Sequence, residues 1–280
     1  MLEYETPQKG QKRKTRRLPL NYMIPNILTL CALAAGLTSI RFALLERWEH
    51  AIIAIVVAAI LDTLDGRVAR LLKGASKFGA ELDSLSDFAC FGVAPALILY
   101  LWTMQGAGPI GWFFVMLFTM CMGLRLARFN VALEDENAPA WKVHFFTGTP
   151  APAGASLVLL PLVLSFNFGE EYLRNSWVVG TFLIVVGSLL VCTIPTFSFK
   201  KVKVAPRWIL PSLLLVAGLA ALMASTPWAA LSALAGLYLI SIPFSYLSHR
   251  RYERKSLVTE TGAESSGEPS VKSASPEDKD

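Results

Sequence analysis

Two stretches of sequence decide the fold of this chain. The first is Asp62-Thr-Leu-Asp65-Gly66-Arg-Val-Ala69-Arg70, and the second, which begins after a gap of eight residues, is Gly79-Ala-Glu-Leu-Asp83-Ser-Leu-Ser-Asp87. These four aspartates lie within or beside two long apolar runs. Each one would cost about 2.5–3.5 kcal/mol at the centre of a membrane-spanning helix on insertion scales. Four uncompensated carboxylates are therefore excluded, and a neutralising partner is required.

The apolar character of the whole chain explains why a membrane is the setting. The 280 residues are 54% apolar and 17% charged. Apolar residues gather in runs of about 18 to 24, the length that crosses roughly 30 Å of hydrocarbon as a helix. The sequence predicts an all-α, polytopic membrane helix bundle with about eight transmembrane helices. The approximate runs are 25–45, 50–72, 79–102, 109–131, 150–167, 176–197, 207–224 and 228–247.

The distribution of basic residues predicts the orientation. All lysines and arginines except Arg41, Arg47 and Arg174 fall in the two terminal tails and in alternate loops. Because cytoplasmic loops are enriched in Lys and Arg, both termini and the edge carrying the aspartates should face the cytoplasm of a bacterial-type inner membrane. The net charge of +5 is then a matter of topology and of anionic lipid headgroups. Basic residues spread over separate loops argue against nucleic-acid binding.

Three regions are expected along the chain. Residues 1–20 form a basic cytoplasmic tail, part of which is amphipathic and suited to the membrane surface. Residues 21–249 form the transmembrane catalytic domain. Residues 250–280 begin with basic residues and continue as a tail rich in Ser, Glu, Pro and Lys, a composition typical of disorder.

Helical periodicity brings the motif residues onto two faces. At 100° per residue, one helix presents a face made of Asp62, Asp65, Gly66 and Ala69. The next helix presents a stripe spaced by four residues, Gly79, Asp83 and Asp87. The connection between the helices is short, so they should pack antiparallel with these faces together.

Converging carboxylates predict a metal centre. Ligand sets made only of oxygen suit hard cations, here Mg²⁺ or Mn²⁺, and two divalent ions would balance four carboxylates. A metal pair is also a usual device for displacement at phosphorus. Gly66, Ala69 and Gly79 leave room for a phosphate-bearing ligand, and Arg70 can offset phosphate charge. Two alternatives are ion pairing of the aspartates with Arg67, Arg70, Lys73 and Lys77, and an ion path in a cation transporter.

The pattern D-x2-D-G-x2-A-R-x8-G-x3-D-x3-D resembles the motif of the CDP-alcohol phosphatidyltransferase family at every fixed position. The resemblance implies that family's fold and a phosphatidyl transfer from a CDP-linked lipid to an alcohol. It also implies that Asp62, Asp65 and Asp83 are metal ligands. Asp87 is implied to be both a ligand and the general base that deprotonates the acceptor hydroxyl.

The same resemblance suggests where CDP-diacylglycerol binds. Gly66, Arg70 and Ser76 match contacts to the CDP moiety. Asn26 and Thr29 lie in the stretch Pro25-Asn26-Ile-Leu-Thr29, which resembles the family's nucleotide contact on the first helix. Family members are generally homodimers with a site open to the cytoplasm, in agreement with the orientation expected from charge.

The acceptor must be inferred outside the motif. The stretches Arg125-Leu-Ala-Arg128-Phe-Asn130, Phe145–Ala153 and Pro195–Lys200 resemble the phosphatidylserine synthase branch, which implies L-serine as acceptor. Arg125 and Arg128 could bind the serine carboxylate through a bidentate fork, and Asn130 could hold a polar group. The same arginines also satisfy the positive-inside rule without any ligand. Glycerol 3-phosphate, inositol phosphate or choline remain alternative acceptors.

Overall fold

A computed structural model describes residues 23–72, 74, 76–134, 146–147, 149–192, 195–196, 211, 214, 217–218, 221–223 and 225–240. The two tails expected at 1–20 and 250–280 lie outside these residues, as does most of the apolar run at 207–224.

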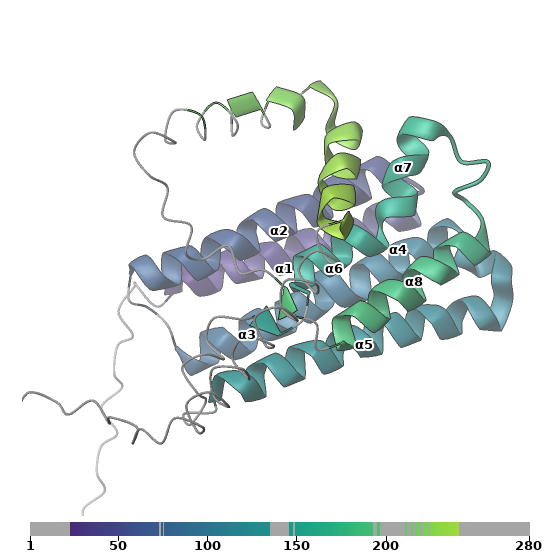
Figure 1. Ribbon diagram of the computed structural model, residues 1–280. Coiled ribbons are helices and arrows are strands. Elements are labelled where there is room, and N and C mark those ends of the chain that lie inside the picture. The colour runs from purple at the N-terminus through teal and green to yellow at the C-terminus, as the bar shows by residue number, and fades with distance from the viewer. Residues whose placement is uncertain are drawn as a thin grey trace, which may run out of the picture.

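The described part of the chain is almost entirely helical (Figure 1). Its helices are α1 (Met23–Leu44), α2 (Trp48–Leu71), α3 (Lys77–Asp87), η2 (Phe88–Val93), α4 (Ala94–Trp102), η3 (Met104–Ala107), α5 (Gly108–Glu134), α6 (Ala151–Val158), α7 (Leu160–Phe168), α8 (Ser176–Val191) and the helix Pro227–Ile240. Two-residue strands, β1 (Phe146–Thr147) and β2 (Pro195–Thr196), pair antiparallel.

Three helical segments in the described residues are long and apolar enough to cross a membrane: Met23–Leu44, Lys77–Trp102 and Met104–Ala132. A fourth span arises if α6 and α7, bent by 43°, count as one. The 24-residue α2 is long enough, but its second half carries the aspartates and arginines of the motif, which lowers its hydropathy. A mostly helical fold with candidate membrane spans is thus confirmed, whereas the count of eight spans stays a prediction.

Small residues allow α1 and α2 to pack closely. The buried positions of α1 recur every three or four residues: Pro25, Thr29, Ala32, Gly36, Ser39 and Ala43. The facing side of α2 buries Ala51, Ala54 and Ala58. Small side chains at such spacing let two backbones approach, which is how helices associate where lipid removes the hydrophobic driving force.

The third span is interrupted directly after Asp87. Here η2 is a π-helical segment that separates α3 from α4. Pro95, in the first turn of α4, provides a reason, because a proline ring removes one helical hydrogen bond and displaces the carbonyl four residues earlier. The η2 segment packs on α1, where the Cys90 thiol donates to the Ala32 carbonyl at 3.4 Å. A Cβ at Gly36 would collide with Cys90, so glycine is required there.

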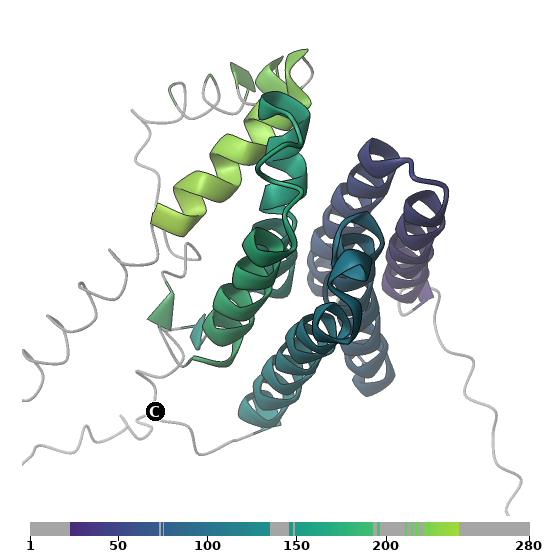
Figure 2. The ribbon, with the colours of Figure 1, turned by 90° about the vertical axis from the view of Figure 1, so that its right-hand side faces the viewer.

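Alternating helix directions place the motif at one end of the bundle. The C-terminal ends of α2 and α5 and the start of α3 lie together there (Figure 1). The β1–β2 pairing joins two of the segments expected to form the acceptor region. The helix Pro227–Ile240 packs on α7, with the rings of Phe166 and Trp228 4.7 Å apart, on the side of the bundle away from α1 (Figure 2).

Candidate active site

Three aspartates converge between α2 and α3. Asp62, Asp83 and Asp87 each offer a carboxylate oxygen, and these oxygens lie within 4.8 Å of one another. Asp83 and Asp87 share a face because they are four residues apart on α3, and the antiparallel packing of α2 brings Asp62 to them. The convergence expected from spacing is therefore present for these three residues.

The cluster has the properties of a cation site. Asp87 Oδ1 is buried and has no hydrogen-bond partner. The one ion pair between described residues is Arg174–Glu170, so no described Lys or Arg is paired with a motif aspartate. Arg70 instead donates from Nε to the Gly66 carbonyl at 3.0 Å. Three carboxylates this close repel one another, and an all-oxygen donor set fits a hard divalent cation.

Asp65 lies beside the cluster rather than within the group of three oxygens. It is 4% exposed, and its Oδ2 accepts a hydrogen bond of 2.7 Å from the Thr29 hydroxyl of α1. Thr29, expected to contact the nucleotide, therefore holds a motif carboxylate in this structure. Its own carbonyl lies 3.4 Å from the Ser86 hydroxyl of α3. Metal ligation by Asp65 stays a prediction.

Replacement of Thr29 by valine tests which role this hydroxyl has. We expect about a tenfold loss of activity, since a hydrogen bond to a charged carboxylate is worth roughly 1.5–3 kcal/mol. If Thr29 acts by holding Asp65, the concentration of Mg²⁺ needed for half-maximal activity should rise, whereas the KM for the CDP-lipid should change little. Thr119→Val is the matched control, because that hydroxyl bonds only within its own helix, to Val115. A change confined to the KM for the CDP-lipid would make Thr29 a nucleotide contact.

Some of the residues expected to contact CDP are packed against one another, and others border open space. Ser76 caps α3, accepting a 3.0 Å hydrogen bond from the Gly79 amide. A Cβ at Gly79 would lie 2.9 Å from Asn26 Oδ1, so Asn26 occupies the space over this glycine. Gly66 is different, because nothing lies within 4 Å of the position of its absent Cβ, and the neighbouring Ala69 is half-buried. Open space for a ligand is thus found over Gly66 and not over Gly79.

The two arginines of the fourth run have different surroundings. Arg125 is 7% exposed, lies 5.7 Å from the centre of the Phe129 ring, and is close enough to Asp87 and Asp62 for electrostatic interaction. Arg128 reaches α8 instead, donating to the carbonyls of Val191 at 2.7 Å and Leu190 at 3.2 Å. Cations commonly satisfy the unpaired carbonyls that end a helix.

Asn130 is tied to α3 next to the cluster. Its amide nitrogen donates to the Ser84 hydroxyl at 3.0 Å, and that hydroxyl lies 3.2 Å from the amide oxygen. Ser84 directly follows Asp83, so Asn130 and Arg125 approach the carboxylates from α5. The structure thus brings Arg125 and Asn130, but not the Arg128 guanidinium, to the side of α5 that faces α3.

Two residues near Arg125 were not among the site residues expected from the sequence, although Thr149 lies within the stretch Phe145–Ala153. Tyr238 has a buried hydroxyl that lies beside Thr149 and within electrostatic reach of Arg125. Thr149 is 2% exposed and precedes α6. No pattern in the apolar run 228–247 distinguishes Tyr238, because its proximity to Arg125 depends on tertiary packing alone.

Comparisons with known proteins agree with this geometry. A protein of Mycobacterium leprae (strain TN), a CDP-diacylglycerol–serine O-phosphatidyltransferase, is 40% identical over 237 residues, which cover 85% of this chain and 79% of the relative. The enzyme of the same name from Mycobacterium tuberculosis (strain ATCC 25618 / H37Rv) is 39% identical over 86% of this chain and 84% of its own. The enzyme of the same name from Helicobacter pylori (strain ATCC 700392 / 26695) is 38% identical over 80% of this chain and 91% of its own.

The family model for CDP-alcohol phosphatidyltransferases matches residues 22–242, which include every motif residue and all of the described helices. The resemblance inferred from the aspartate motif is confirmed. With its apolar helices, its carboxylate cluster and these relatives, the chain is an integral membrane protein that belongs to the CDP-alcohol phosphatidyltransferase family.

Proposed function

We propose that this protein transfers the phosphatidyl group of CDP-diacylglycerol to the hydroxyl of L-serine, giving phosphatidylserine and CMP. The observation that carries the proposal is the buried Arg125 beside the carboxylate cluster, in a chain whose relatives carry this activity in their names. A buried cation next to the reaction centre gives the acceptor carboxylate a binding partner.

The chemistry is a displacement at the phosphorus that bears diacylglycerol. The serine oxygen forms a bond to that phosphorus, and the bond from phosphorus to the bridging diphosphate oxygen breaks. CMP leaves with the electron pair, and Asp87 accepts the serine proton. Two divalent cations, Mg²⁺ or Mn²⁺, held by Asp62, Asp65, Asp83 and Asp87, would supply the positive charge that stabilises the diphosphate and the developing charge on the leaving group.

The CDP-lipid is proposed to bind at the same end of the bundle. Gly66 offers open space for the diphosphate to approach the α2 backbone, with Ala69 on the same face. Arg70 lies one turn further on and can pair with a phosphate. The wall contributed by α1 and α3 consists of Asn26, Thr29, Ser76 and Gly79. Asn26 is in close contact with Gly79.

The arrangement of cations favours serine over the other acceptors. Glycerol 3-phosphate and inositol phosphate carry a dianionic group, which favours several cations, whereas Arg125 is the one basic side chain of the described residues that is buried beside the cluster. Choline has no carboxylate for Arg125 to bind. Asn130, whose amide nitrogen donates to the Ser84 hydroxyl, is proposed to hold a polar group of the acceptor. Contact between Arg128 and the acceptor stays a prediction, since its guanidinium binds the end of α8.

We further propose how the protein is arranged in the membrane. The protein has eight spans in the bacterial inner membrane, with both termini and the active site on the cytoplasmic side, where the basic loops lie. The catalytic domain extends over residues 21–249, between the basic tail 1–20 and the tail 250–280. The enzyme works as a homodimer among anionic membrane lipids, as the family resemblance implies.

The proposal is tested by offering the purified protein one alcohol at a time. Protein in detergent receives CDP-diacylglycerol and Mg²⁺ or Mn²⁺, and the release of CMP is followed with L-serine, glycerol 3-phosphate, inositol phosphate or choline. We expect release with L-serine and phosphatidylserine as the lipid product. Faster release with any other alcohol would overturn the assignment of serine.

Replacement of Arg125 by lysine should separate acceptor binding from the rest of the reaction. An ammonium cannot reproduce the planar fork of guanidinium, and a lost charge-assisted bond raises KM about ten- to a hundredfold. We expect the KM for serine to rise by this factor, with little change in the KM for CDP-diacylglycerol. Arg128→Lys should instead lower thermal stability, because it weakens the contact between α5 and α8. Equal damage to both KM values by Arg125→Lys would assign Arg125 to the diphosphate.

A further inference from the structure

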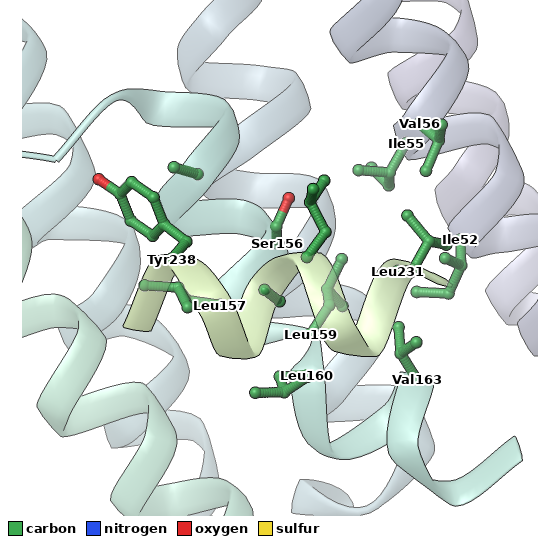
Figure 3. Close-up of a pocket in the computed structure, with 13 residues that line it drawn as sticks. Ile52, Ile55, Val56, Ser156, Leu157, Leu159, Leu160, Val163, Leu231 and Tyr238 are labelled. Atoms are coloured by element: carbon green, nitrogen blue, oxygen red, sulfur yellow. The ribbon is translucent and has the colours of Figure 1, made fainter. Parts of the chain in front are cut away.

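The helix Pro227–Ile240 brings one hydroxyl to the active-site end of the bundle. An apolar cavity of about 180 Å³ separates this helix from α2, α6 and α7. Its lining is aliphatic apart from Ser156 and Tyr238. Figure 3 shows the Tyr238 oxygen at one end of the cavity, pointing away from Ile55 and Val56 at the other end. The phenol therefore presents its polar atom on the side away from the aliphatic lining.

The neighbours of that oxygen are Thr149 and Arg125. Thr149, almost fully buried, faces the Tyr238 hydroxyl from the start of α6. Arg125 lies close enough to both Tyr238 and Asp87 for electrostatic interaction. A buried phenol oxygen next to a buried guanidinium is an acceptor for its N–H groups, whereas the guanidinium has no lone pair to offer in return.

Arg125 needs such a neighbour to keep a fixed direction. Among the described residues Arg125 forms no ion pair. Its guanidinium lies over the face of Phe129, 5.7 Å from the ring centre, a contact that constrains distance more than rotation. A bidentate bond to a carboxylate demands that the planar fork be aligned before the ligand arrives. A hydroxyl that accepted one N–H group of the guanidinium would fix that alignment and leave the other N–H groups for the ligand.

We infer that Tyr238, supported by Thr149, is a positioning residue that orients Arg125 for the carboxylate of the amino-acid acceptor. This inference rests on the proposed function, because it requires an acceptor with a carboxylate. In this proposal Tyr238 acts on Arg125 alone. Its effect on the reaction passes through Arg125, so it belongs to substrate selection and not to the chemical step.

Tyr238→Phe in the full-length protein tests this role. It removes one oxygen and keeps the ring that lines the cavity. We expect the KM for L-serine to rise about tenfold, with kcat and the KM for CDP-diacylglycerol within about twofold of the wild type. Thr149→Val should act in the same direction with a smaller effect. Tyr100→Phe is the matched control, because it deletes a phenol oxygen from a half-buried tyrosine of α4 that packs on Trp112, and it should leave all three constants unchanged.

A double variant shows whether Tyr238 acts through Arg125. In the Arg125→Lys background, Tyr238→Phe should add no more than about twofold to the KM for serine, because the fork that it positions is absent. Independent, multiplying effects would contradict the inference. So would equal losses in kcat and both KM values, which indicate damage to the fold, or an unchanged KM for serine. Thermal unfolding of each variant is measured alongside, and Thr149→Val decides the question if Tyr238→Phe does not yield folded protein.

Failure of this inference is distinguishable from failure of the proposed function. If wild-type protein releases CMP with another alcohol and not with serine, the assignment of serine fails. If wild-type protein uses serine and Tyr238→Phe has the wild-type KM, the proposed function stands and the positioning role is wrong.

Discussion

Asp62→Asn and Asp83→Asn are each expected to abolish CMP release while the protein still inserts into the membrane and purifies normally. Asparagine keeps the size of the side chain but removes the charge that one carboxylate contributes to the three-oxygen cluster. Metal-bound charge stabilisation is worth several kcal/mol in the transition state, and a loss of about 4 kcal/mol lowers the rate roughly a thousandfold. CMP release at saturating serine and CDP-diacylglycerol measures this loss.

Glu81→Gln is the matched control for these two variants. Glu81 lies on the same helix, α3, but it is exposed and is not part of the cluster. Its neutralisation should leave activity within about twofold, since isolated surface charges contribute little. A chelator should abolish wild-type activity, and Mg²⁺ or Mn²⁺ should restore it. Full activity in the chelator, or normal turnover by both asparagine variants, would remove the metal role of the cluster.

The aspartate cluster was accessible from the sequence because both of its requirements are local. Residues four apart share a helical face, and a short connection forces neighbouring helices to pack antiparallel. Asp65 shows where this reasoning stops. Its spacing places it near Asp62 on α2, but its carboxylate is held by Thr29 of α1, a contact between residues 36 positions apart. Whether a polar residue of a third helix reaches into a shared face depends on packing that periodicity does not describe.

The arginines of α5 show a second limit of prediction from the sequence. Arg125 and Arg128 are three residues apart and were expected to act on one face, yet one lies near Asp87 and the other at the end of α8. Long side chains amplify a small difference in direction, so neighbouring positions reach different partners. The apolar run at 150–167 was predicted as one helix from its hydropathy. Pro161 interrupts it near the 43° bend between α6 and α7, because proline cannot continue the helical hydrogen bonding.

Asp87→Asn is expected to remove the chemical step and to preserve binding of the CDP-lipid. Asp87 contributes one oxygen to the cluster, and its buried Oδ1 has no partner. An amide cannot accept the serine proton at neutral pH, and loss of a positioned general base costs about a hundred- to ten-thousandfold. Asp62 and Asp83 remain to hold metal, so the affinity for CDP-diacylglycerol should fall far less than the rate does.

The comparison between Asp87→Asn and Asp83→Asn distinguishes a base from a ligand. Both variants should be nearly inactive, so the deciding measurement is the affinity for CDP-diacylglycerol, obtained from Mg²⁺-dependent binding of the lipid to detergent-solubilised protein. A residue that only holds metal should lose binding and turnover together, whereas a base should lose turnover alone, because an interaction made only in the transition state leaves the ground state unchanged. Normal turnover by Asp87→Asn, or a loss restricted to lipid affinity, would exclude Asp87 as the base. Proton transfer would then have to be assigned to another group near the cluster.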